Sequence, residues 1–183
     1  LERGVKLFRY DAGLWHAIGA IYLKRGETEY AKTVYKDALT VDTLDKSLRR
    51  SLDKLYSDGE DEPEILSQAK LLQGYYDQVQ NLRGTSRSGL RQLRNQLEDY
   101  MKQYPDDPNG AILLARYFSL TGNDIKSKEL LEGVLAKEPD NLSANLALSS
   151  LLLQAEDVQA AKKYLQNALF YYPGNRTAES RLS

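Results

Sequence analysis

Cysteine is absent from the 183 residues, and histidine occurs once, as His16. The absence of cysteine excludes disulfides, thiolate nucleophiles and cysteine-based zinc sites, and it leaves the redox compartment open. A single histidine excludes the metal motifs that need a pair of histidines. The sequence also lacks the glycine patterns that bind nucleotide phosphates, and we expect its glycines at turns. We therefore expect no enzyme activity, no metal and no cofactor.

An excess of charge and a long apolar run are lacking too. Lys and Arg total 25 against 26 Asp and Glu, so a net charge of −1 gives no overall field to attract nucleic acid or an anionic membrane. No apolar stretch approaches the ~20 residues that cross a bilayer, and no signal-peptide pattern begins the chain. We expect a soluble domain of the cytoplasm or the periplasm without membrane insertion. Because it starts at Leu1 rather than at a methionine, we also expect an excerpt from a longer protein.

The chain does contain an internal repeat. Three prolines share a spacing of 34 residues: Pro105, Pro139 and Pro173. Between them lie two units, residues 108–141 and 142–175, and each reads as helix, turn and helix. The midpoint turn falls at Gly122 in one unit and at Glu156 in the other. A third copy covers residues 12–45.

This third copy carries the fullest set of characteristic residues. Gly19 and Ala31 are small where two helices must approach, and large apolar residues recur at helical spacing on one face. The set is Trp15, Ile18, Gly19, Tyr22, Gly26, Ala31, Tyr35 and Ala38. The pattern resembles the tetratricopeptide repeat position by position. That resemblance implies an all-α fold, a right-handed α-solenoid of antiparallel helix pairs.

The middle of the chain departs from the repeat. A degenerate unit begins at Lys46 and its turn is acidic; the spacing of these acids does not match an EF-hand calcium loop, so we interpret the stretch as a solvated turn. An apolar stripe then predicts one long helix over residues 63–82, and a Gly- and Ser-rich stretch predicts a loop over 83–89. We divide the chain into tetratricopeptide-like helices over 1–82, this loop, and tetratricopeptide-like helices over 90–183. Either the superhelix continues through the loop, or the loop is a hinge.

The resemblance also implies a binding groove, because proteins of this kind bind peptides or helices on the concave face that the first helix of each pair lines. The matching positions are His16, Ala20, Leu23, Arg50, Lys54, Asn109, Ile112, Arg116, Ser119, Leu146, Ser150 and Leu153. The set mixes cationic and apolar side chains, so we expect an acidic and apolar protein segment as the partner. The predicted function is a non-catalytic protein-interaction scaffold or assembly factor.

Other functions are kept as alternatives. A run of Arg83, Arg87, Arg91 and Arg94 offers a basic patch for a nucleic-acid adaptor, which the neutral net charge does not favour. The segment could also belong to a larger enzyme or to a bacterial envelope or secretion assembly protein, by analogy alone. Apolar residues near the end, Leu169, Phe170 and Leu182, are expected to lack cover and leave self-association open.

Overall fold

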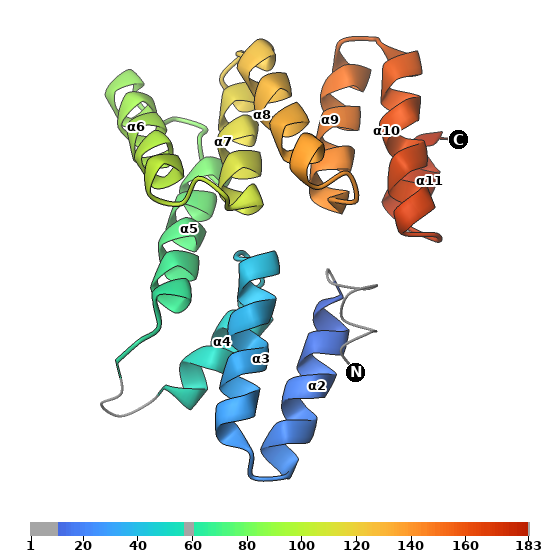
Figure 1. Cartoon of the computed structure of the whole chain (residues 1–183). Helices are drawn as coiled ribbons and strands as arrows, with labels where there is room; N and C mark the ends of the chain where they lie inside the picture. Colours follow the sequence, from blue (N-terminus) through green and yellow to red (C-terminus); the bar gives the residue numbers. More distant parts are fainter. Residues whose placement is uncertain (1–10, 57–60, 183) are drawn as a thin grey trace. The chain divides into compact units, whose positions relative to one another are not determined.

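The computed structural model describes residues 11–56 and 61–182, and every regular element in those two ranges is an α-helix. Figure 1 gives their order. The helices are α2 (Ala12–Lys24), α3 (Thr28–Val41), α4 (Lys46–Leu55), α5 (Glu64–Gln80), α6 (Arg87–Gln103), α7 (Pro108–Leu120), α8 (Asp124–Lys137), α9 (Leu142–Gln154), α10 (Val158–Tyr171) and α11 (Arg176–Leu182). The all-α prediction is confirmed.

Contacts divide the chain into two compact units, Leu1–Gln78 and Val79–Ser183. We call them the first and second unit and describe each by itself. The division falls inside α5, so the last residues of that helix belong to the second unit.

Helix starts follow from short polar side chains that cap the free N–H groups of the first turn. The Asp11 carboxylate accepts from the Leu14 N–H at 3.0 Å, and the Asn141 amide oxygen accepts from the Ala144 N–H at 3.0 Å. Between the helices of a pair, Gly122 turns the chain with a φ of 81°. Glu156 holds the equivalent turn with a φ of 61°, a left-handed conformation that a residue with a Cβ adopts less readily. The turn positions predicted for the repeats 108–141 and 142–175 are thus confirmed.

Small and large residues meet between α2 and α3 in the first unit. Gly19 is buried, and a Cβ added there would collide with the ring of Tyr35. Tyr35 and Leu39 share one cluster with Trp15 of α2 and with Leu52 of α4. This close approach is the one that the sequence predicts for Gly19.

The long helix of the irregular middle is present, but the loop after it is shorter than expected. Helix α5 covers Glu64–Gln80, and α6 begins at Arg87 instead of beyond Gly89. The cause is an N-cap that the loop prediction overlooked, because the Ser86 hydroxyl accepts from the Gly89 N–H at 3.1 Å.

Two regular pairs repeat in the second unit, with α7 antiparallel to α8 and α9 antiparallel to α10 (Figure 1). Their shared core includes Leu131, Leu148 and Leu151. The short helix α11 packs on α10 through Ala178, and both Leu169 and Leu182 join this contact. The expectation that these two leucines lack cover is therefore wrong, because α11 covers the end of α10, whereas Phe170 remains 77% exposed.

Candidate functional site

The predicted groove residues of the second unit lie on the first helices of its two regular pairs. Between Asn109 and Ser119 of α7, every residue is buried except the four that the groove prediction names, which are Asn109, Ile112, Arg116 and Ser119. On α9, Leu146, Ser150 and Leu153 are half-buried. Helices α7 and α9 contact one another, so these side chains belong to adjacent helices of one unit. We call the seven residues the first-helix face.

Side chains from neighbouring helices already reach this face. The Arg116 guanidinium donates to the Gln80 side-chain oxygen at 2.9 Å, at the end of α5. The Arg181 guanidinium of α11 donates to the Leu146 carbonyl at 3.0 Å and to the Ser150 hydroxyl at 2.7 Å. Arg181 is therefore a cation of the first-helix face that the groove prediction missed. Arg181 follows Leu146 by 35 residues, which is close to the repeat length. The repeat spacing could therefore have predicted its position near Leu146.

In the first unit the predicted groove residues lie on α2 and α4, which are in contact. Ala20, Leu23, Arg50 and Lys54 are exposed. His16 is half-buried, and the centre of its ring lies 5.8 Å from that of Tyr35. Its ring thus packs partly within the α2–α3 pair, and its Nε2 atom is buried without a hydrogen bond.

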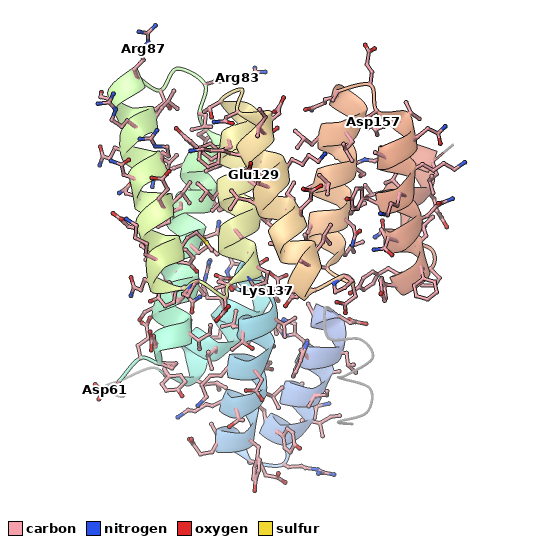
Figure 2. All side chains as sticks on the ribbon, turned by 45° about the horizontal axis from the view of Figure 1, so that its top comes forward. Asp61, Arg83, Arg87, Glu129, Lys137 and Asp157 are labelled. Atoms are coloured by element: carbon pink, nitrogen blue, oxygen red, sulfur yellow. The ribbon has the colours of Figure 1, made fainter. Side chains whose placement is uncertain are left out.

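The basic run is mostly solvent-exposed. Arg87 and Arg91 are exposed on α6, and in Figure 2 the labelled side chains of Arg83 and Arg87 extend away from the helices. Arg94 is half-buried, and its Nε lies 3.7 Å from a Glu98 oxygen, which is an ion pair too long for a hydrogen bond. The basic patch therefore consists of three free-standing side chains around the start of α6 rather than four.

The acidic turn lies partly outside the described residues, but its end is visible. The Glu62 carboxylate accepts from the Lys70 ammonium at 2.8 Å, and Lys70 also lies 2.7 Å from an Asp53 oxygen. The hydrogen bond from Lys70 lowers the pKa of Glu62 below its ordinary value. These bonds tie α4 to α5, which supports a structural use of this stretch.

Residues 11–56 and 61–182 contain no group of three or more His, Cys, Asp or Glu side chains that could hold a metal ion. Within the same residues, each helix is too short or too polar to cross a membrane.

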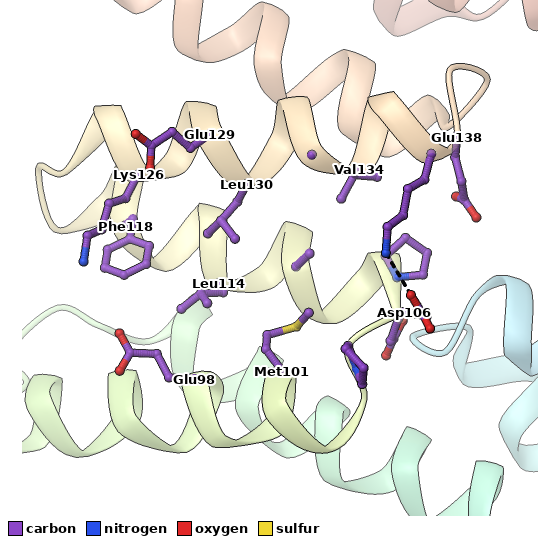
Figure 3. Close-up of a pocket in the computed structure, with 16 residues that line it drawn as sticks. Glu98, Met101, Asp106, Leu114, Phe118, Lys126, Glu129, Leu130, Val134 and Glu138 are labelled. Carbon is purple, nitrogen blue, oxygen red and sulfur yellow. Dashed lines mark hydrogen bonds and ion pairs between the residues drawn. The ribbon is translucent and has the colours of Figure 1, made fainter.

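A second surface feature was not predicted. A crevice of about 450 Å³ lies between α6, α7 and α8, and Figure 3 shows its lining. Leu114, Leu130 and Val134 form its apolar floor together with Met101, and charged side chains border it. At one end Lys137 donates to Asp106 at 2.8 Å, a bond that lowers the pKa of Asp106 below its ordinary value.

The signal that could have revealed the crevice is Gly133. Glycine inside a helix is unfavourable by roughly 1 kcal/mol relative to alanine, so it needs a reason. Gly133 lies within α8 and Gly74 within α5, and the expectation that the glycines fall at turns is wrong for both. The prediction that the glycines lie at turns failed for these two residues because the spacing of apolar residues does not reveal a glycine inside a helix.

Comparison with known proteins agrees with this geometry. A family model described as "Tetratricopeptide repeat" matches residues 126–180, which include all of α9 and α10. Residues 126–180 of the chain therefore match the tetratricopeptide-repeat family. A curated relative is the "Cellulose synthase operon protein C" of Pseudomonas fluorescens (strain SBW25), 28% identical over 109 residues. That match covers 56% of this chain and only 8% of the relative.

One solved structure is also similar. The crystal structure of the P58(IPK) TPR domain is 17% identical, with a TM-score of 0.49, and the match covers 99% of this chain and 56% of that one. Tetratricopeptide repeats as a family support a general role in protein–protein interaction.

The first-helix face and the crevice lie on different sides of α7. Residues two apart on an α-helix point in roughly opposite directions. Arg116 of the first-helix face is two residues from Leu114 and from Phe118, which both line the crevice. A ligand on one surface would therefore leave the other accessible.

Proposed function

We propose that this protein is a non-catalytic scaffold that holds a peptide or helix of a partner protein on its first-helix face. The observation that carries the proposal is the burial pattern of α7. Seven of the eleven residues from Asn109 to Ser119 are buried, and the four left accessible are those that a groove would need. Three of these four residues carry polar side chains, which suit recognition of a partner.

The chemistry of the face indicates the kind of partner. Arg116 and Arg181 supply guanidinium groups, and Ile112, Leu146 and Leu153 supply half-buried apolar surface. In the first unit, Arg50 and Lys54 supply further cations on α4. Guanidinium groups bind carboxylates through charge-assisted hydrogen bonds, so an acidic segment with apolar side chains fits this face.

A crosslinking experiment tests the proposal. A photoreactive amino acid is placed at Ile112 or at Leu153, and in a control protein at the exposed Lys162 of α10, in the organism that encodes the chain. Capture of one shared protein segment from Ile112 and Leu153, but not from Lys162, is the expected result. Arg116→Glu should reduce that capture by about tenfold, since a desolvated charge contact contributes on the order of 1–2 kcal/mol.

The control for folding is the helical circular dichroism signal of Arg116→Glu and of the matched charge reversal Lys162→Glu. Both should keep the wild-type signal, and Lys162→Glu should leave capture unchanged. Equal capture from all three labelled positions would remove the case for the first-helix face. Capture that is insensitive to Arg116→Glu would do the same.

The curated relative supports a context for the scaffold. A protein of a cellulose synthase operon resembles part of this chain, so we propose that the chain belongs to an assembly protein of the bacterial envelope. Proteins that co-purify with the full-length protein should then include components of a polysaccharide or envelope assembly. Recovery of cytosolic partners alone would contradict this context but not the scaffold itself.

A further inference from the structure

The crevice exists because one repeat lacks side chains that the next repeat has. Residues 34 positions further along occupy the equivalent place between α8, α9 and α10. There the Asn167 amide donates to the Pro139 carbonyl at 3.2 Å and to the Asn145 side-chain oxygen at 3.3 Å. Asn145 donates to the same Pro139 carbonyl at 3.0 Å. These hydrogen bonds link the turn before α9 to both α9 and α10.

At the crevice, neither amide is present. Gly133 stands in the place of Asn167 and Ala111 in the place of Asn145. A Cβ added at Gly133 would have no atom within 4 Å, so the missing side chain leaves open space. Leu130 also replaces the larger Tyr164. The void is therefore a difference between repeats and not a property of the repeat.

The shape of the crevice suits a helix. It follows α7 from Pro108 to Phe118, a length of roughly 15 Å at the usual rise per residue, with α6 and α8 on its two sides (Figure 3). An amphipathic helix that lies in such a trough places apolar side chains at positions i, i+3 or i+4, and i+7 on the floor. About 15 Å accommodates roughly three turns of helix, enough for three such side chains.

The border of the crevice carries more acid than base. Five carboxylates line the crevice, those of Glu98, Asp106, Asp107, Glu129 and Glu138, against two ammonium groups, those of Lys126 and Lys137. Two of these charges neutralise one another in the Lys137–Asp106 bond, and Lys126 lies 5.2 Å over the ring of Phe118. Glu129 is exposed on α8 and has no partner within the described part of the chain. Lys or Arg side chains on a bound helix would meet this excess of carboxylates.

We propose that the crevice is a second docking site, separate from the first-helix face, for an amphipathic helix of a partner protein. The apolar face of that helix lies on Leu114, Leu130 and Val134. Its flank carries Lys or Arg, which pairs with Glu129 and also approaches Glu98, whose carboxylate lies 3.7 Å from the Arg94 Nε. A scaffold with two such sites can hold two partners, or two parts of one partner, at the same time.

The test uses the whole 183-residue chain and two labelled helical peptides of about 14 residues, or roughly four turns. Both peptides carry leucines at i, i+4 and i+7; one has lysines on its flank and the other has glutamates. Fluorescence anisotropy measures the dissociation constant of each. The lysine peptide should bind saturably and more tightly than the glutamate peptide, by about threefold or more for exposed charge pairs.

Gly133→Leu is the decisive variant, because Gly133 lines the crevice and a Cβ added there meets no atom within 4 Å. This variant should weaken binding of the lysine peptide by about tenfold or more. The removal of a helical glycine should keep or raise the thermal stability of the protein. Gly74→Leu is the matched control: Gly74 is an exposed helical glycine of α5 with open space around it, and its replacement should leave binding unchanged. Arg116→Glu should also leave binding unchanged, which separates this site from the first-helix face.

Glu129→Lys provides a second line of evidence and should weaken binding of the lysine peptide by a few-fold. The proposal is overturned if the lysine peptide does not bind saturably, if Gly133→Leu does not affect its binding, or if the glutamate peptide binds equally well. Binding of a small apolar dye that Gly133→Leu abolishes, without binding of either peptide, would assign the crevice to small molecules and also overturn the proposal.

Discussion

A single missing Cβ sets the distance between two helices of the first unit. The Tyr35 ring occupies the place that a side chain at Gly19 would need, and Tyr35 is 3% exposed. The aromatic ring therefore packs directly on the backbone of α2. Burial also raises the pKa of Tyr35 above its ordinary value.

Gly19→Ala should therefore destabilise the protein, although alanine favours helices. Overpacking of a tight core contact costs about 1–3 kcal/mol, more than the roughly 1 kcal/mol gained from helix propensity. Gly74→Ala is the control, since a Cβ there meets nothing within 4 Å, and it should stabilise by about 0.5–1 kcal/mol. Urea unfolding followed by circular dichroism measures both. Equal changes in the two variants would show that the Tyr35 contact is not tight.

At the scale of elements, buried amides hold α9 to α10 and to the turn before α9. Asn145 is fully buried, and it donates to the carbonyls of Pro139 and Asn141 at 3.0 and 2.9 Å. Asn167 completes the group from α10. The equivalent elements α7 and α8 lack these amides, so otherwise similar helix pairs differ in how firmly the turn is fixed.

Asn145→Ala should cost about 1–3 kcal/mol, because the carbonyls of Pro139 and Asn141 each lose a donor and the Asn167 amide loses an acceptor. The reciprocal change, Ala111→Asn together with Gly133→Asn, should install the bonds between α7 and α8 and keep or raise stability. Thermal unfolding compares the variants. A cost below about 0.5 kcal/mol for Asn145→Ala would mean that water replaces these bonds.

At the scale of the whole molecule, contacts separate the two units within α5. In repeat proteins each element depends mainly on its neighbours, so a division of contacts allows parts of the chain to unfold separately. Trp15 is the only tryptophan and is buried in the core of the first unit, which makes its fluorescence a reporter of that unit alone.

Urea unfolding should therefore give different midpoints by the two probes, because fluorescence follows the first unit and circular dichroism at 222 nm follows the helices of both. Gly19→Ala should lower the urea concentration at the midpoint of the fluorescence transition. The later part of the circular dichroism transition should occur at the same urea concentrations as in the wild type. Coincident transitions in both proteins would instead indicate one cooperative unit.

The sequence by itself determined the helix pairs. Three patterns predicted them: prolines at a fixed spacing, small residues at Gly19 and Ala31, and apolar side chains at helical spacing. These patterns follow from local helix geometry, which a single sequence is enough to indicate. The resemblance to the tetratricopeptide repeat, rather than periodicity alone, named the four accessible residues of α7. The loop prediction placed the start of α6 too late, because the Ser86 cap lies inside a stretch whose composition is typical of a loop.

Only the tertiary structure decided what lies between helices of different repeats. Arg181 reaches Ser150 on another helix, α11 covers Leu169, and the crevice appears where Gly133 and Ala111 face one another across a pair. Each of these features depends on packing between elements that are distant in sequence. The crevice in particular is a space without side-chain atoms. A periodic pattern records which side chains are buried, whereas the space left between them is set by how whole helices pack.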